Sequence, residues 1–86
     1  MASTIACKVV TPTGVVFEDA VAAINGPGWE GRFGILPRHA PYLVRLVAGR
    51  LILKGAGGAE RFGLDIVGGY LIIAHDRCTV LVEGVR

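Results

Sequence analysis

The sequence has few of the residues from which catalytic and metal centres are built. Its 86 residues include only two histidines and two cysteines. His39 and His75 are far apart along the chain, and the cysteines do not have the spacing of a metal site. Asp65 and Asp76 are isolated carboxylates, so nothing indicates a paired acid–base site. We therefore predict a protein that is not an enzyme and that needs no cofactor or metal.

Long apolar runs and blocks of one charge are also missing. No apolar stretch approaches the 18 residues of a membrane-spanning helix, and the opening Met-Ala-Ser-Thr-Ile lacks the features of an export or transit signal. We expect a soluble chain that stays in the compartment where it is made. Nine Lys and Arg residues against seven Asp and Glu residues give a net charge of +2 without a basic stripe. Only Trp29 and Phe33, near Arg32 and Arg38, loosely suggest a nucleic-acid surface, so we predict no nucleic-acid binding.

The two cysteines could form one disulfide at most. Cys7 and Cys78 each lie in an apolar run that is typical of a strand, and no secretion signal precedes them. We expect both to be reduced thiols in the core.

One glycine-rich segment superficially suggests a phosphate cradle. The run Gly26-Pro-Gly-Trp-Glu-Gly is followed by neither a lysine nor a predicted helix, which a phosphate-binding loop requires. We expect a β-turn loop here and no nucleotide binding.

What the sequence does have is apolar side chains in excess of what a small core can bury. Residues 1–86 allow one domain with a thin core, while 52% of the residues are hydrophobic. Some apolar side chains must stay at the surface, and contiguous exposed apolar surface usually marks a docking site for another protein.

The dominant pattern along the chain is an alternation of apolar and polar residues, broken by Gly, Pro, Asn and Asp about every ten residues. This pattern predicts an all-β protein, a single small antiparallel sandwich or barrel of nine or ten strands. Gly55 to Gly58 is expected to form a hairpin turn, and Gly68-Gly69 a second turn. A short turn of helix could fit only within residues 39–47. The expected strands cover residues 4–10, 15–18, 20–25, 32–36, 42–47, 50–54, 60–67, 70–74 and 78–82.

One segment has an unusual composition. The run Glu30-Gly-Arg-Phe-Gly-Ile-Leu-Pro-Arg-His-Ala-Pro41 closely resembles the signature loop of the epsilon subunit family of F-type ATP synthases. The resemblance extends over the whole chain, from Lys8-Val-Val-Thr-Pro near the start to Thr79-Val-Leu-Val-Glu83 near the end. It implies a β-sandwich of about ten strands.

The resemblance also implies a function. Members of this family are non-catalytic subunits of the central stalk, or rotor, bound to the gamma subunit on one side and to the membrane c ring at the base. Such a subunit couples ion transport to ATP synthesis and is peripheral to the membrane through the c ring, on the cytoplasmic face of the inner membrane in a bacterium. The alternative is a free-standing β-sandwich module that binds proteins of another complex.

The resemblance assigns the c-ring contact to the loop that holds Pro37, Arg38 and His39, with Arg32 next to it. Many relatives carry an acidic residue in place of Arg32 and a glycine in place of Arg38. This chain therefore adds positive charge where c-ring loops often present an arginine. We expect a compensating carboxylate, or no such arginine, in its c-ring partner.

The gamma-facing surface is assigned from the strand pattern. If Leu71 and Ile73 point into the core, Tyr70, Ile72 and Ala74 point outward and form an apolar stripe on a face that should be polar. We interpret this stripe as a docking surface for gamma, with Tyr70 as an aromatic anchor. The alternative is a central strand with both faces covered by the protein itself.

Epsilon subunits of this family usually continue into a hairpin of two helices. The 86 residues end directly after the last predicted strand. Neither the inhibition of ATP hydrolysis nor the ATP binding that the family attributes to that hairpin is expected from these residues.

Overall fold

The computed structural model describes residues 3–86 and contains eight strands in this range. Met1 and Ala2, which belong to the segment judged to lack an export signal, lie outside the described residues. The described residues include no helix, so none of them forms a helix that could cross a membrane, and the helical turn considered within residues 39–47 is not present. The strands are β1 (Ile5–Thr11), β2 (Gly14–Val21), β3 (Ala23–Gly28), β4 (Gly31–Ile35), β5 (Tyr42–Leu46), β6 (Gly49–Lys54), β7 (Glu60–Ala74) and β8 (Arg77–Val85).

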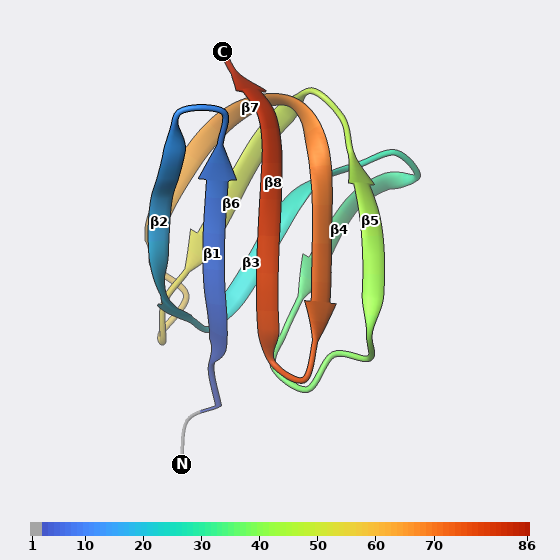
Figure 1. Ribbon diagram of the computed structural model, residues 1–86. Helices are drawn as coiled ribbons and strands as arrows, with labels where there is room; N and C mark the ends of the chain where they lie inside the picture. Colours follow the sequence, from blue (N-terminus) through green and yellow to red (C-terminus); the bar gives the residue numbers. More distant parts are fainter. Residues whose placement is uncertain (1–2) are drawn as a thin grey trace.

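The strands form two layers that share the long strand β7 (Figure 1). The first layer has the order β2-β1-β8-β7-β5, and β6, β3 and β4 lie behind it. The first half of β7 pairs with β6 and its second half with β5. All pairings are antiparallel except that of β1 with β8. The predicted sandwich class is confirmed, with eight strands in place of about ten and one parallel pair.

The strands predicted at residues 60–67 and 70–74 form the single strand β7, because Gly68 and Gly69 make a bulge within it. The register of β7 against β8 shifts on both sides of Gly68. At Gly69, with φ +146°, a Cβ would lie 2.0 Å from the carbonyl oxygen of Leu81, so only glycine fits. Glycine pairs within a strand typically mark such bulges, which bend the strand. The turn predicted here is therefore wrong: the chain bends from one layer into the other and stays extended.

The predicted loop at Gly26-Pro27-Gly28 is also wrong, since these buried residues complete β3. A Cβ on Gly26 would lie 2.7 Å from the Phe33 ring, so the glycine lets the aromatic side chain of β4 pack directly on the backbone. Only Trp29 and Glu30 form the turn that follows.

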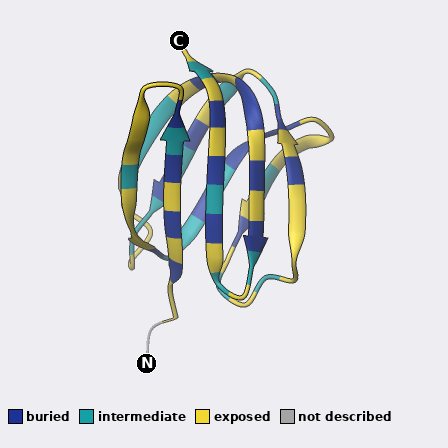
Figure 2. Cartoon of the chain, in the orientation of Figure 1, coloured by how far each residue is buried: buried dark blue, intermediate teal, exposed yellow. Residues whose placement is uncertain are grey.

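The core follows the predicted alternation of side chains (Figure 2). Cys7 and Cys78 lie opposite each other on β1 and β8, are 2% exposed and are free thiols, as predicted. The hydrogen bond with Cys7, together with burial, raises the pKa of the Cys78 thiol. This thiol is therefore protonated at neutral pH. The largest fully buried side chains are Ile5, Ile24, Ile35, Leu51, Leu53, Ile66, Leu71 and Ile73.

Candidate functional site

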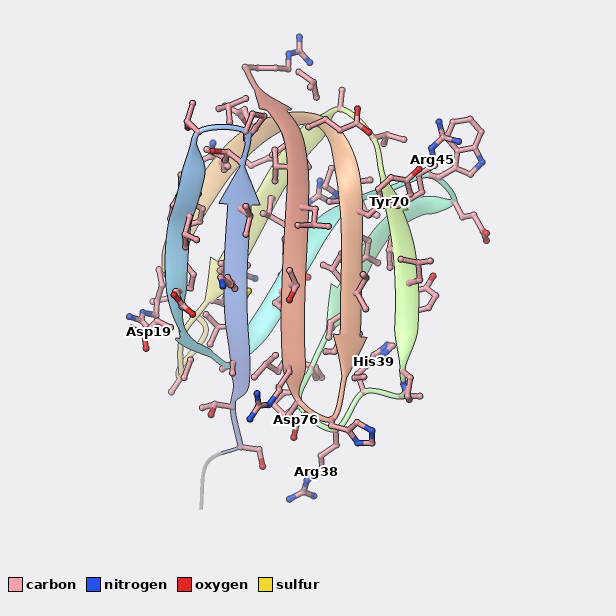
Figure 3. The ribbon with its side chains drawn as sticks, viewed as in Figure 1. Asp19, Arg38, His39, Arg45, Tyr70 and Asp76 are labelled. Carbon is pink, nitrogen blue, oxygen red and sulfur yellow. The ribbon has the colours of Figure 1, made fainter. Side chains whose placement is uncertain are left out.

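The loop between β4 and β5 crosses the end of the sandwich at which the described chain begins (Figure 1). Pro37, which lacks a backbone N–H, follows β4 closely and is half-buried. Arg38 has a φ of 66°, in the left-handed region that residues with a Cβ seldom adopt. Its backbone N–H donates a hydrogen bond of 2.6 Å to Oδ1 of Asp76, in the turn between β7 and β8 (Figure 3).

The polar groups of this loop remain available to a partner. The Arg38 guanidinium is exposed, donates from Nη2 to the Ser3 hydroxyl at 3.4 Å, and takes part in no ion pair among residues 3–86. His39 Nδ1 lies 2.8 Å from the carbonyl oxygen of Ala40. Because a carbonyl can only accept, Nδ1 carries the proton in this bond. No residue in the described range 3–86 bonds to Nε2, which can therefore interact with another molecule. The ring lies against Tyr42 with centroids 5.6 Å apart.

The structure does not bring Arg32 to this loop. Its Nη2 donates to the carbonyl oxygen of Arg50 on β6 at 3.1 Å, within the layer that also contains β4. Arg50 in turn pairs with Asp65 at 3.2 Å, and the Asp65 carbonyl accepts the N–H of Arg86. Arg32 thus belongs with the end of the molecule where the chain terminates, whereas Arg38 lies at the opposite end. The expectation that Arg32 lies beside Arg38 is wrong, because β4 carries the two residues to different ends of the sandwich.

The outward stripe on β7 exists as predicted. Tyr70 and Ile72 are 44% and 47% exposed, whereas Leu71 and Ile73 between them are buried. Ala74 is half-buried at the end of the strand. Residues 3–86 therefore leave this face of the strand uncovered, contrary to the alternative in which both faces are covered.

Neighbouring strands enlarge this stripe. Leu43 on β5 lies opposite Ile72 and is 62% exposed, and Leu81 on β8 lies opposite Tyr70 and is 44% exposed. Together Leu43, Tyr70, Ile72 and Leu81 form what we call the outer apolar face. Its residues come from three adjacent strands, so the face is contiguous, which is typical of a protein-docking surface.

An open groove of about 480 Å³ borders the outer apolar face. On one side lies the β3–β4 hairpin with Trp29, and on the other lie Leu43, Arg45 and Tyr70. The Arg45 guanidinium carbon stands 4.6 Å from the centroid of the exposed Trp29 ring, and the backbone N–H of Trp29 donates to the backbone carbonyl oxygen of Arg45 at 2.8 Å. Tryptophan, tyrosine and arginine are the residues that most often dominate binding energy at interfaces.

Trp29 and Arg45 were not predicted as parts of this surface. The available signal was a tryptophan placed between glycine-rich turn residues, where burial is not expected. Arg45 gave no signal because its stacking on Trp29 requires β5 to lie beside the β3–β4 hairpin, which the sequence does not reveal.

The remaining charged clusters tie strands together. Arg61 on β7 donates to Oδ2 of Asp19 on β2 at 2.8 Å and to the carbonyl oxygen of Ala20 at 2.6 Å. The hydrogen bond from Arg61 holds the pKa of the Asp19 carboxyl below its usual value. Within residues 3–86 no group of three or more His, Cys, Asp and Glu side chains could hold a metal ion. The arrangement thus offers surfaces and a basic loop, and we find no constellation for chemistry in the described residues.

Comparison with known proteins identifies relatives over nearly the whole chain. Residues 4–86 match the family model described as "ATP synthase, Delta/Epsilon chain, beta-sandwich domain". The ATP synthase epsilon chain of Sulfurovum sp. (strain NBC37-1) is 38% identical over 77 residues, which cover 90% of this chain and 59% of the relative. That of Nitratidesulfovibrio vulgaris (strain DSM 19637 / Miyazaki F) is 40% identical over 76 residues, 88% of this chain and 55% of the relative. This chain therefore spans somewhat more than half the length of these curated relatives.

Two solved structures share the fold. A chain in the cryo-EM structure of the Euglena gracilis mitochondrial ATP synthase (OSCP/F1/c-ring) superposes with a TM-score of 0.88 at 21% identity, covering 98% of this chain and 53% of that chain. A chain in the Tetrahymena thermophila mitochondrial ATP synthase (central stalk/c-ring) gives 0.78 at 16% identity, with 100% and 66% covered. At these identities the likeness establishes the fold alone.

Proposed function

Because this chain belongs to the family of β-sandwich domains of the ATP synthase delta/epsilon chain, we propose that it is a non-catalytic subunit of the central stalk of a rotary ATP synthase. In this role it links the gamma subunit to the membrane c ring and couples ion transport to ATP synthesis. The observation that carries the proposal is the outer apolar face, on a chain whose family match runs from residue 4 to residue 86. A side chain such as Ile72, 47% exposed in the middle of a layer, is suited to being covered by a partner.

The gamma subunit is the proposed partner of the outer apolar face. Tyr70 and Ile72 provide the centre of the contact, with Ala74 at its border. The groove beside Tyr70 adds the stacked pair of Trp29 and Arg45. An apolar centre with aromatic and arginine side chains around it is the usual composition of an interface that binds strongly.

The c ring is the proposed partner of the loop that holds Pro37, Arg38 and His39. Arg38 carries a charge without an ion-pair partner among the described residues, and His39 has a free Nε2. We leave Arg32 out of the proposed contact, because its bond to Arg50 places it toward the other end of the sandwich. The unpaired charge of Arg38 calls for a carboxylate, or the absence of an arginine, in the facing loop of the c subunit. With these partners the chain is peripheral to the membrane, on the cytoplasmic face of the inner membrane if the source is bacterial.

Co-expression with the gamma subunit of the same organism tests the proposal. We expect the two chains to elute together in size-exclusion chromatography and to bind purified c rings jointly. Elution of the chain alone, with gamma folded, would reject the stalk role and favour a protein-binding module of another complex. Binding of the complex to c rings that carry a basic loop without any neighbouring acid would reject the charge argument at Arg38.

A further inference from the structure

The turn between β7 and β8 is joined to the neighbouring segments through Asp76. Its carboxylate oxygen Oδ1 accepts the backbone N–H of Arg38 at 2.6 Å, and its own carbonyl oxygen accepts the N–H of Ala6 at 2.9 Å. The residue thus connects the turn with the start of β1 and with the loop after β4. Figure 3 shows Asp76 and Arg38 together at this end of the sandwich.

The backbone conformation of Arg38 is unfavourable by itself and is compensated by a contact with Asp76, outside its own loop. Its φ of 66° lies in the left-handed region, which a residue with a Cβ disfavours by roughly tenfold relative to the right-handed one. A hydrogen bond from a backbone N–H to a carboxylate is about twice as strong as one between neutral groups. The bond to Asp76 therefore offsets the conformational cost at Arg38.

The geometry of this bond leaves the charge of Arg38 free. Asp76 uses its carboxylate on the backbone of Arg38, and no ion pair between the two side chains is present in residues 3–86. The guanidinium instead extends toward Ser3. Asp76 can thus set the direction of the Arg38 side chain without neutralising it.

We propose that Asp76 is the positioning residue of the loop that carries Arg38 and His39. It holds Arg38 in the left-handed conformation and so fixes the direction in which both side chains leave the backbone toward the c ring. The inference rests on the proposed function for the identity of the partner, while the effect on the loop can be measured on the chain alone.

The first test measures the exchange of the Arg38 backbone amide with deuterium by NMR. We expect Asp76→Ala to accelerate this exchange about tenfold, because it removes the acceptor that the amide has among residues 3–86. Asp19→Ala is the matched control, since Asp19 is also an exposed carboxylate that accepts a backbone N–H, from Ala20 at 2.7 Å. An unchanged Arg38 exchange rate in Asp76→Ala would overturn the proposal.

The second test measures the binding of the chain, in complex with gamma, to purified c rings. We expect Asp76→Ala to weaken binding about fivefold relative to the unchanged chain. The same substitution should have a smaller effect when the double variant is compared with Arg38→Gly alone, because glycine adopts the left-handed conformation freely. A merely structural role of Asp76 would weaken binding equally in both backgrounds and would contradict positioning.

The single substitutions separate this inference from the proposed function. If His39→Ala weakens c-ring binding and Asp76→Ala does not, the positioning role is refuted. If neither Arg38→Ala nor His39→Ala affects c-ring binding, the proposed contact fails, whereas the exchange rate of the Arg38 amide still decides whether Asp76 shapes the loop.

Discussion

The substitution Ile72→Glu gives a quantitative test of the outer apolar face. Ile72 is 47% exposed in the free chain. Removing a whole isoleucine side chain from water is favourable by roughly 1.5–3 kcal/mol. A partner that covers the exposed half of Ile72 therefore gains about 1 kcal/mol of binding free energy. In the complex, a glutamate at this place would either be buried as a carboxylate without a counter-charge or have to take up a proton. We expect this to weaken binding by several kcal/mol. We expect gamma binding to weaken by at least about 3 kcal/mol, which is more than about a hundredfold.

The same substitution should leave the free chain folded. An exposed strand position changes stability by no more than about 1 kcal/mol, which lowers the melting temperature by roughly 4–8 °C in a domain of this size. Isothermal titration calorimetry with gamma, together with thermal unfolding followed by circular dichroism, measures both quantities.

Val16→Glu is the matched control for this experiment. Val16 is 43% exposed on β2, the edge strand of the same layer, and β1 and β8 separate it from β7. The chemical change is nearly the same, yet the position lies outside the outer apolar face. If Ile72→Glu and Val16→Glu both bind gamma as tightly as the unchanged chain, the reasoning about this face is refuted.

Three further predictions concern stability and the thiols. Gly69→Ala should destabilise the chain by about 3 kcal/mol or more in urea unfolding, because its Cβ would lie 2.0 Å from the Leu81 carbonyl, whereas Gly57→Ala has no atom within 4 Å and should cost clearly less despite its φ of +88°. The pKa of Asp19 is lowered from 3.8 by Arg61, so stability from this pair is complete above about pH 4 and is lost as the pH falls through the lowered pKa. Asp19→Asn should therefore flatten the fall in melting temperature below about pH 4; an equal fall in both proteins would contradict it. Both cysteine thiols are 2% exposed and should react with a thiol reagent only after denaturant is added, so rapid labelling of the native chain would argue against their burial.

The candidate site was only partly predictable. The outward direction of Tyr70 and Ile72 follows from their alternation with Leu71 and Ile73, because side chains of a strand point to opposite faces in turn. The position of the loop that holds Arg38 follows from Pro37, which ends the preceding strand because proline cannot donate to a ladder. The separation of Arg32 from this loop could not be predicted, because it depends on the direction in which β4 crosses the sandwich.

Local sequence determined the all-β class, most strand positions, the buried alternation and the outward apolar stripe of this protein. These properties depend on neighbouring residues and on the period of two, so they can be read without knowing which strands pair. Tertiary structure alone decided that Gly68 and Gly69 bend one strand through both layers, that Arg45 stacks on Trp29, and that Asp76 holds Arg38. Each of these features joins segments far apart in the chain or depends on strand pairing, and which segments meet is decided by the packing of the whole sandwich.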